Sequence, residues 1–582
     1  MNKILKKLNI LLDKKQKLQM AGLIVLMFFG ALLEAFSIAG IVPVVTIVLA
    51  PEKLEEIRLI APVLEALPFT SEKGFGIFIM LGLVAAFIIK NIYIYWEYKL
   101  LYRFIFTNQF RTSEQMMKNF IRRDYEFFLE ADTAVIQRSI TSDVNNMYAL
   151  IQALLTLVSE VIIFISIALV LIYADPLMTG IIAVLLIITL FIIKIFIKPV
   201  MKRAGEENQY FYSGLFKHIS EMVMGIKEVK VSGREKYFVE EYSICGSGYV
   251  KAVQKYTVIN NIPRLIIEVV CIASVIGYFL YLYLRGGDNT GTFTVISAFA
   301  LGLSRLMPCA NRINNQLNNI AYFEPFFMGV TDDLQKEIEA ENTDISGFEI
   351  PKEKLPVKKE ICLKDITFHY PTMPDVNIFE HANLTIPVGS SVGIVGTTGA
   401  GKSTIVDILL GLLKVEEGSI LVDGVNVMEE GNYRKWLKNV GYIPQTIFML
   451  DDTIRSNVAF GIPKESIDED RVWEVLKEAQ LDEFVKGLPE GLDTRIGERG
   501  VRISGGQRQR IGIARALYED PEVLVMDEAT AALDNDTEKA IVDSINRLHG
   551  TKTMIIIAHR LQTIEKCDSV YRVENKTVTK ER

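Results

Sequence analysis

Six long apolar runs in the first 320 residues constrain the fold of this chain more than any other feature. A helix needs about 20 consecutive, mostly apolar residues to cross a bilayer. A buried soluble core could account for one such run but hardly for six, so the pattern predicts a polytopic membrane domain. Pro43 within the overlong first run favours a kink or a tilt there. The predicted spans lie near residues 20–50, 74–96, 150–174, 176–197, 262–284 and 292–317.

Positive charge is concentrated in three of the segments that flank these runs. Lysines and arginines cluster in residues 3–17, 99–123 and 202–234. Because cytoplasmic connections carry the excess of lysine and arginine, these segments are predicted to be cytoplasmic, with the spans in the plasma (inner) membrane. On the opposite side, residues 173–176 predict a tight turn. The glutamate-rich residues 51–73 are compatible with either an amphipathic outer helix or a solvated loop helix.

The two long cytoplasmic connections mix polar and apolar residues without strong helix breakers. They predict that the membrane helices continue into the cytosol and that each pair is joined by a turn. Such turns, near residues 127–143 and 212–230, are expected to press on a cytoplasmic domain and to carry its motion to the spans. The N-terminus and the second half of the chain are predicted to be cytoplasmic as well.

Charged side chains also occur within or at the margins of the apolar runs. Intramembrane charges are costly and normally face a cavity or a charged partner. Arg305 and Arg312 are seven positions apart and share one helix face, which Asn315 extends. Two interpretations stay open: a cationic strip for an anionic head group, or arginines that snorkel or pair with Glu268 or Glu160. The charged residues are Glu34, Lys90, Glu160, Arg264, Glu268, Arg305 and Arg312.

Length and composition narrow the function classes further. A chain of 582 residues is too long for one hydrophobic core. The charged residues 331–360, which include two prolines, predict a linker between a transmembrane domain over residues 1–330 and a second domain over residues 361–582. A net charge of −7 does not suggest nucleic-acid binding. The five cysteines lack zinc or disulfide spacing and indicate reduced thiols.

Residues 396–404 read GTTGAGKST and match the phosphate-binding loop pattern G-x-x-x-x-G-K-S/T. The apolar residues 391–395 before them predict a buried strand, and residues 405–410 after them predict a helix, as this motif requires. Glycines turn backbone N–H groups toward phosphate oxygens, and the helix N-terminus adds its positive dipole end. Lys402 is expected to reach the β- and γ-phosphates, and Ser403 to ligate Mg²⁺. This half of the chain is therefore predicted to bind ATP.

An acidic pair follows a second predicted strand. Asp527 and Glu528 come directly after the apolar residues 523–526. Downstream of a phosphate loop, this arrangement predicts a Walker B site in which Asp527 holds Mg²⁺ through water. Glu528 suits the general base that activates the attacking water.

Residues 503–510, ISGGQRQR, open a predicted helix between these two motifs. With them the chain closely resembles the ATP-binding cassette (ABC) transporter family, whose signature is LSGGQ. Ile503 in place of leucine is a mild apolar change. Ser-Gly-Gly again places N–H groups and a hydroxyl at a helix N-terminus. In the family, these groups contact the ATP held by the phosphate loop of the opposite subunit.

Other residues match the family's motifs one by one. Tyr370 resembles the aromatic residue that stacks on adenine, and Gln445 resembles the Q-loop glutamine that touches Mg²⁺ and the attacking water. Residues 531–534 resemble the D-loop, and His559 resembles the switch histidine that contacts the γ-phosphate. Glu498 resembles the residue that relays contact from the coupling helices. The resemblance implies nucleotide contacts from Tyr370, Gly396, Thr397, Thr398, Gly399, Ala400, Gly401, Lys402, Ser403, Thr404, Ser504, Gly505, Gly506, Gln507 and Asp534.

Six spans ahead of one cassette resemble an exporter half-transporter over essentially the whole chain. The resemblance implies an all-α six-helix transmembrane domain fused to an α/β P-loop ATP-binding cassette domain. Its activity would be ATP hydrolysis coupled to transport, with ATP and Mg²⁺ as cofactors. The intact motifs favour a homodimer, since each ATP needs a phosphate loop and a signature from different copies. The implied catalytic residues are Glu528, His559 and Gln445, and the implied Mg²⁺ ligands are Ser403, Gln445 and Asp527.

The cargo is the least constrained part of the function. Residues 303–313, LSRLMPCANRI, and the outer segment 51–73 resemble the lipid-linked oligosaccharide flippases of bacterial protein glycosylation. Arg305 and Arg312 would then attract the pyrophosphate linkage. The alternative is a multidrug or general lipid exporter, in which both arginines are structural. Peptide export is disfavoured because no peptidase domain precedes the spans and no cysteine precedes Cys245, and the six spans disfavour a soluble ATPase.

Overall fold

The chain forms two units in the computed structural model. The first comprises Met1–Arg123 and Ala131–Thr343, and the second comprises Asp124–Glu130 and Asp344–Arg582. The short segment Asp124–Glu130 therefore groups with the second unit, although its sequence lies within the first half. The described residues are 2–40, 44, 72–174, 176–285, 289–339, 351, 353–429, 431–527, 547–557 and 564–582.

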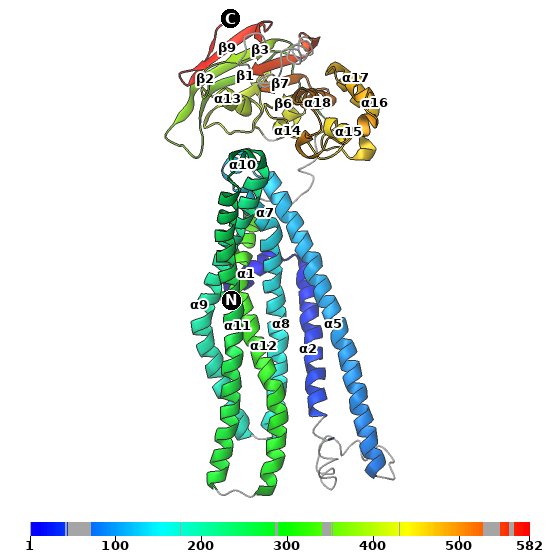
Figure 1. Ribbon diagram of the computed structural model, residues 1–582, viewed down its shortest axis with the longest axis vertical. Coiled ribbons are helices and arrows are strands. Elements are labelled where there is room, and N and C mark those ends of the chain that lie inside the picture. Colours follow the sequence, from blue (N-terminus) through cyan, green and yellow to red (C-terminus); the bar gives the residue numbers. More distant parts are fainter. Residues whose placement is uncertain are drawn as a thin grey trace. The chain divides into compact units, whose positions relative to one another are not determined.

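The first unit is helical throughout its described part, as Figure 1 shows. Its long helices follow from apolar runs rich in leucine, isoleucine and phenylalanine that contain few helix breakers. Pro199, Pro263, Pro308 and Pro325 lie inside long helices without ending them. The helices are α1 (Asn2–Leu11), α2 (Lys14–Ala39), α5 (Glu72–Arg122), α7 (Thr133–Arg138), the π-helix η2 (Ser139–Asp143), α8 (Val144–Ala174), α9 (Pro176–Met224), α10 (Ile226–Ser232), α11 (Glu235–Arg285) and α12 (Asn289–Glu339).

Five helices of the described chain are long and apolar enough to cross a membrane. They correspond to the first five predicted spans, and the sixth predicted span falls within α12. The helices also continue past the apolar runs, as predicted: α5 extends to Arg122 and α9 to Met224. The predicted outer segment lies outside the described residues up to residue 71. The five segments are Lys14–Glu34, Gly76–Arg122, Thr133–Leu169, Thr179–Met224 and Glu235–Gly277.

The second unit contains two sheets. A four-stranded antiparallel sheet has the order β2-β1-β4-β5. A six-stranded sheet has the order β10-β9-β3-β8-β7-β6 and is parallel except for the edge strand β10. Strands buried on both faces, such as β7 and β8, are apolar except for Asp527 at the end of β7 and Thr553 at the start of β8, as expected for a parallel sheet covered by helices. The strands are β1 (Glu360–His369), β2 (Asn377–Pro387), β3 (Ser391–Val395), β4 (Glu417–Val422), β5 (Val425–Asn426), β6 (Val440–Ile443), β7 (Val523–Asp527), β8 (Thr553–Ile557), β9 (Ser569–Glu574) and β10 (Thr577–Lys580).

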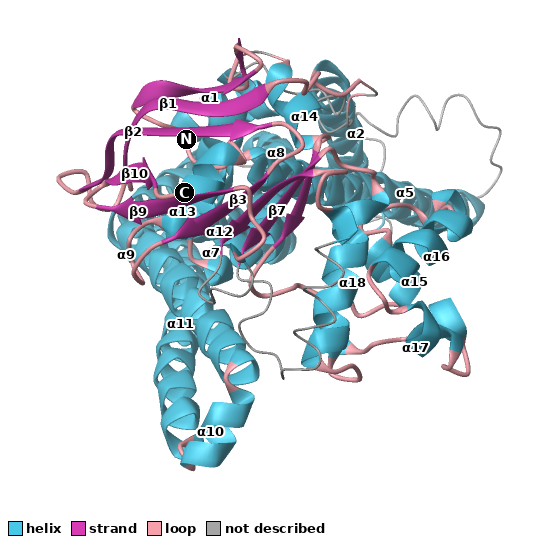
Figure 2. Ribbon diagram, turned by 90° about the horizontal axis from the view of Figure 1, so that it is seen from above, coloured by secondary structure: helices cyan, strands magenta, loops and turns pink. Residues whose placement is uncertain are grey.

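The helices of the second unit divide between two hydrophobic cores. The first core packs the antiparallel sheet, strand β3 and helix α13 together and includes the fully buried Trp436. The second core packs α15, α16 and α18 against strands β6 to β8, and Figures 1 and 2 show α15 to α18 gathered on one side of the strands. The two cores give the unit an αβ part and a helical part. The helices are α13 (Lys402–Leu409), α14 (Asn432–Leu437), α15 (Ile454–Val458), α16 (Glu469–Glu478), α17 (Asp482–Lys486) and α18 (Gly505–Tyr518).

Helix α6 (Tyr125–Glu130) belongs to the second unit and lies in one of the turns expected from the sequence. The backbone N–H of Lys414 donates to Glu126 Oε1 at 2.9 Å. The ammonium of Lys414 donates to Asp124 Oδ2 at 2.6 Å. A segment from the turn that follows α5 is therefore anchored on the αβ part of the second unit.

Candidate nucleotide site and intramembrane charges

Three of the predicted nucleotide-site motifs lie at one edge of the parallel sheet. The phosphate loop follows β3, Gln445 follows β6, and Asp527 is the last residue of β7. Because β3, β8, β7 and β6 run parallel, the carboxyl ends of all four lie at the same edge, where ligands of open α/β sheets bind. The structure thus brings together motifs that are up to 131 positions apart in the sequence.

Glycines in the phosphate loop are required by its backbone. Gly399 and Gly401 have φ angles of +81° and +100°, in the left-handed region that other residues rarely adopt. A Cβ added to Gly401 would lie 2.9 Å from the Phe379 ring, and one added to Gly396 would lie 2.6 Å from the Val573 carbonyl oxygen. The loop is therefore held against β2 and β9, and it leads directly into the N-terminus of α13.

Lys402 is the cation of this loop. Its side chain is 6% exposed, and its Nζ donates to the carbonyl oxygens of Gly396 and Thr397, both at 3.1 Å. Among the described residues, no carboxylate forms an ion pair with it. A buried ammonium that is held only by loop carbonyls suits a phosphate group as its anionic partner. The loop therefore fits ATP by its backbone, its helix N-terminus and its charge.

The predicted Mg²⁺ ligands supply oxygen atoms, as this ion prefers. Asp527 is 8% exposed at the end of β7, while Ser403 is exposed in the first turn of α13. Gln445 is exposed just beyond β6. All three come from the carboxyl edge of the sheet, so the residues present fit a magnesium ion that neutralises phosphate charge.

Tyr370 also lies beside the phosphate loop. It follows β1, and its hydroxyl shares a hydrogen bond of 2.9 Å with Thr404 Oγ1. Glu498 is exposed at the start of a 3-10 turn, Glu498–Gly500. The adenine contact of Tyr370 and the relay role of Glu498 stay predictions. Three further predicted residues, Glu528, Asp534 and His559, lie outside the described residues.

Asp407 is a residue of this site that the sequence analysis missed. It lies on α13, where burial and, secondarily, the Asp527 carboxylate raise its pKa to about 6. Burial, followed by the same Asp527 and by Asp407, raises the pKa of Tyr442. Burial and then Asp407 also raise the pKa of Tyr125 on α6. A lone acidic residue within the otherwise apolar residues 405–410 was the signal in the sequence that could have drawn attention to Asp407.

Asp407→Asn is expected to stabilise the protein at neutral pH. A carboxyl with a raised folded pKa binds more protons when folded, so between about pH 4 and pH 6 its contribution to stability falls as pH rises. The half-exposed position limits the gain from the asparagine to about 1 kcal/mol at pH 7. Thermal unfolding of the full chain at pH 4.5 and 7.5 measures this gain in stability. Asp482→Asn is the control of opposite sign, because Lys486 lowers the pKa of Asp482; equal shifts of both variants at both pH values would contradict this prediction.

The signature residues form the N-terminus of α18. Ser504 caps the helix: its Oγ accepts from the Gln507 N–H at 3.2 Å, and Gln507 Oε1 accepts from the Ser504 N–H at 2.8 Å. This capping box holds an exposed helix N-terminus in place. The helix packs in the second hydrophobic core, whereas α13 packs in the first. Within the described residues, no hydrogen bond or ion pair joins the signature to the phosphate loop of the same chain.

Two pairs of the predicted intramembrane charges are matched within the helical unit. Arg312 Nε on α12 donates to Glu160 Oε1 on α8 at 2.6 Å. Lys90 on α5 lies 2.9 Å from Glu34 on α2. The Glu160 pairing is one of the alternatives that the sequence left open for Arg312. Half of the Arg312 side chain stays exposed, and the side chain of Arg305 lies outside the described set.

Comparison with known protein families gives two matches, one in each half of the chain. Residues 379–531 match the model of the ABC transporter family, and residues 58–307 match the model of the ABC transporter transmembrane region. An ATP-dependent lipid A-core flippase from Bordetella avium is 30% identical over 453 residues, which cover 76% of this chain and 73% of that protein. The chain belongs to the ABC transporter family.

Two further comparisons show what this ABC transporter is similar to. An ATP-dependent lipid A-core flippase from Saccharophagus degradans is 33% identical over 367 residues, which cover 62% of this chain and 59% of the flippase, so less than two thirds of that relative is matched. The structure of a bacterial Atm1-family ABC exporter with ATP bound superimposes with a TM-score of 0.76 at 21% identity, covering 97% of this chain and 95% of that one. The fold class expected from the sequence, a helical transmembrane domain fused to an ATP-binding cassette, is confirmed, and so is an ATP hydrolase domain of this family.

Proposed function

We propose that this ABC transporter couples ATP hydrolysis to the flipping of an amphipathic lipid from the inner to the outer leaflet of the plasma (inner) membrane. The cargo is a lipid with an anionic head group, and specifically a polyprenyl-pyrophosphate-linked oligosaccharide. Matched relatives that are named lipid A-core flippases support lipid as the cargo class. The N-terminus and the cassette lie in the cytoplasm, as the lysine and arginine clusters suggest.

The functional transporter is a homodimer. Ser504–Gln507 and the phosphate loop pack in different cores of the cassette, which supports a site completed by the signature of a second copy. Two ATP molecules, each between one phosphate loop and the partner's signature, draw the cassettes together. Helix α6, anchored on the cassette through Lys414, carries this closure to α5. Ser403, Gln445 and Asp527 would hold Mg²⁺, which would supply charge neutralisation of the phosphates. Lys402 orients the phosphates, and Glu528 takes the proton of the attacking water.

The observation that carries the cargo proposal is the half-exposed Arg312. Glu160 binds its Nε, which fixes the guanidinium on α12 and leaves the side chain half exposed. A guanidinium oriented in this way suits bidentate binding of a pyrophosphate. The same ion pair also supports a second candidate function, a multidrug or general lipid exporter in which Arg312 only joins α12 to α8.

Arg305→Ala combined with Arg312→Ala is expected to lower flipping of a fluorescent polyprenyl-pyrophosphate saccharide in vesicles by about tenfold or more. Basal ATPase activity should stay within about twofold, because the cassette is untouched. Glu160 is buried and loses its partner in this variant, which itself destabilises the fold. A triple variant that adds Glu160→Gln removes the unpaired charge. Restored flipping in the triple variant would assign the arginine a structural role and favour the general exporter.

A further inference from the structure

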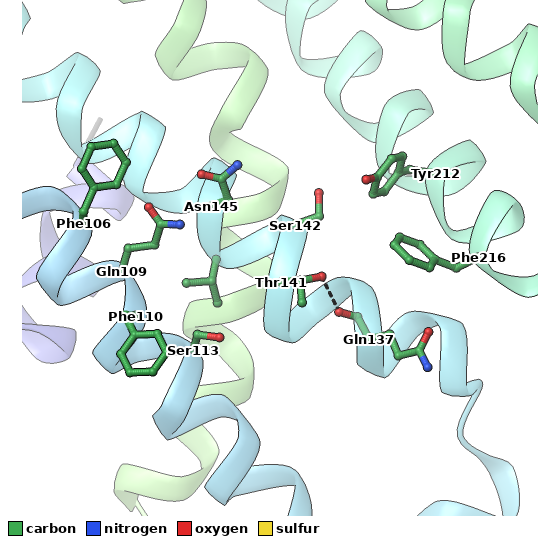
Figure 3. Close-up of a pocket in the computed structure, with 11 residues that line it drawn as sticks. Phe106, Gln109, Phe110, Ser113, Gln137, Thr141, Ser142, Asn145, Tyr212 and Phe216 are labelled. Carbon is green, nitrogen blue, oxygen red and sulfur yellow. Dashed lines mark hydrogen bonds between the residues drawn. The ribbon is translucent and has the colours of Figure 1, made fainter. Parts of the chain in front are cut away.

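A pocket of about 780 Å³ lies within the helical unit, and its described lining includes none of the intramembrane charges discussed above. Figure 3 shows its lining side chains coming from three segments: α5, the stretch from α7 through η2 to the start of α8, and α9. Phe106 and Phe110 lie ten and fourteen residues beyond Trp96, where the predicted span ends. At 1.5 Å per residue the pocket is about 15–20 Å further along α5, toward the end from which the chain enters the cassette unit.

Aromatic rings form two sides of this pocket. Phe106 and Phe110 contribute from α5, and Tyr212 and Phe216 contribute from α9. The rings of Tyr212 and Phe216 meet edge to face with centroids 5.2 Å apart. Phe110 is 74% exposed, so its ring is not packed in the protein core and can contact a ligand. Two aromatic walls of this kind suit a flat molecule with an apolar face.

Apart from Val144, the remaining lining residues are polar but uncharged. The amide side chains of Gln109, Gln137 and Asn145 form no hydrogen bond with any described residue, and an amide can both donate and accept. Two hydroxyls are tied back to the backbone: Ser113 Oγ donates to the Ile140 carbonyl at 2.8 Å, and Thr141 Oγ1 donates to the Gln137 carbonyl at 2.7 Å. Among the described residues that line the pocket, none is acidic or basic.

A buried network fixes the wall between α7 and α9. Arg138 Nε donates to Asp143 Oδ2 at 3.1 Å, and Gln209 Nε2 donates to the same oxygen at 2.8 Å. Arg138 also donates to the Gln209 carbonyl at 3.0 Å and to Ser213 Oγ. Asp143 ends η2, a π-helix, and insertions of this type commonly mark functional sites because they redirect neighbouring side chains. None of the residues in this network lines the pocket. The network therefore holds the pocket open without using the polar groups of the lining.

We propose that this pocket binds a neutral saccharide ring of the cargo's head group; this deepens the proposed flippase function and rests on it. A sugar ring presents an apolar C–H face to aromatic rings and a rim of hydroxyls that donate and accept, as the three amides do. A phosphate or carboxylate would instead require a cation that the lining does not supply. The pocket therefore binds the glycan, while the charged linkage is bound elsewhere.

Two lipids with the same polyprenyl chain test this assignment in the reconstituted full-length protein. One is polyprenyl pyrophosphate that carries a neutral disaccharide, and the other is polyprenyl pyrophosphate alone. Tyr212→Ala should raise the concentration of the disaccharide lipid that half-maximally stimulates ATPase activity by about tenfold and leave that of the bare lipid unchanged. Tyr212→Phe keeps the ring and should retain most of the preference. Tyr210→Ala, a 74% exposed tyrosine on the same helix that does not line the pocket, is the matched control.

The outcomes separate this proposal from the flippase proposal. If Tyr212→Ala weakens the ATPase response to both lipids equally, or to neither of them, the pocket does not bind the saccharide. The flippase proposal is unaffected by that result. If wild-type protein responds to neither lipid, the flippase proposal fails. In that case, labelling at the pocket by a photoreactive disaccharide supports the pocket alone, and its absence overturns it. A photo-crosslinker at Asn145 that captures another copy of the chain would identify the pocket as a subunit interface and overturn the saccharide assignment.

Discussion

Lys402→Ala is expected to reduce ATP hydrolysis by about a hundredfold or more and to weaken ATP binding as well. Lys402 is the buried cation of the phosphate loop, and its ammonium has only loop carbonyls as partners in the described chain. Alanine removes the charge that neutralises the phosphates, and no other lysine or arginine occurs among residues 396–404 to replace it. Binding of a fluorescent ATP analogue and release of phosphate, both measured on the full chain, report the two losses.

Lys364→Ala provides the matched control for this variant. Lys364 is an exposed lysine in β1 of the same unit, with no ion pair among the described residues. Its replacement should leave nucleotide binding and turnover within about twofold, as is usual for a surface substitution. Nucleotide affinity in Lys402→Ala equal to that of the control would show that the loop backbone alone binds the phosphates.

The fold was predictable where its determinants are local. Each apolar run is a continuous stretch, and a helix satisfies its backbone hydrogen bonds within the stretch, so membrane helices can be read one at a time. The phosphate loop is equally local, because nine consecutive residues supply its glycines, its lysine and its serine. The strand before it and the helix after it are both found in the structure as β3 and α13.

Partners that come from distant segments were not predictable in the same way. The proximity of Asp407 to Tyr125 depends on α6 folding with a unit whose sequence begins more than 200 residues later. The sequence offered Arg312 two acidic partners, Glu160 and Glu268, and only the packing of α12 against α8 selects the first. The pocket proposed to bind a saccharide likewise takes its walls from three segments, none of which carries a motif. Local patterns do not specify such contacts, because they depend on which helix faces meet.

Glu528→Gln is expected to reduce ATP turnover as much as Lys402→Ala does but to have a different effect on ATP binding. Glu528 directly follows Asp527 in the sequence, and a positioned general base contributes about 10²- to 10⁴-fold to such reactions. Glutamine keeps the size of the side chain and loses only the ability to take a proton. Hydrolysis should therefore fall by about a hundredfold or more, while ATP affinity stays within about threefold of wild type. Glu522→Gln, an exposed change just before β7, is the control, and near-normal turnover in Glu528→Gln would remove the general-base assignment.

The contrast between the two variants tests which step moves the cargo. Lys402→Ala is expected to fail before the proposed closure of the cassettes on ATP, whereas Glu528→Gln is expected to bind ATP and to stop before hydrolysis. If closure on ATP drives the spans, a vesicle assay of Glu528→Gln should show a single burst of flipping, about one lipid per dimer, and then no more. Lys402→Ala should show no burst. A burst that is absent from both variants would place the transport step after hydrolysis, and helix α6 would then transmit the release of phosphate rather than the binding of ATP.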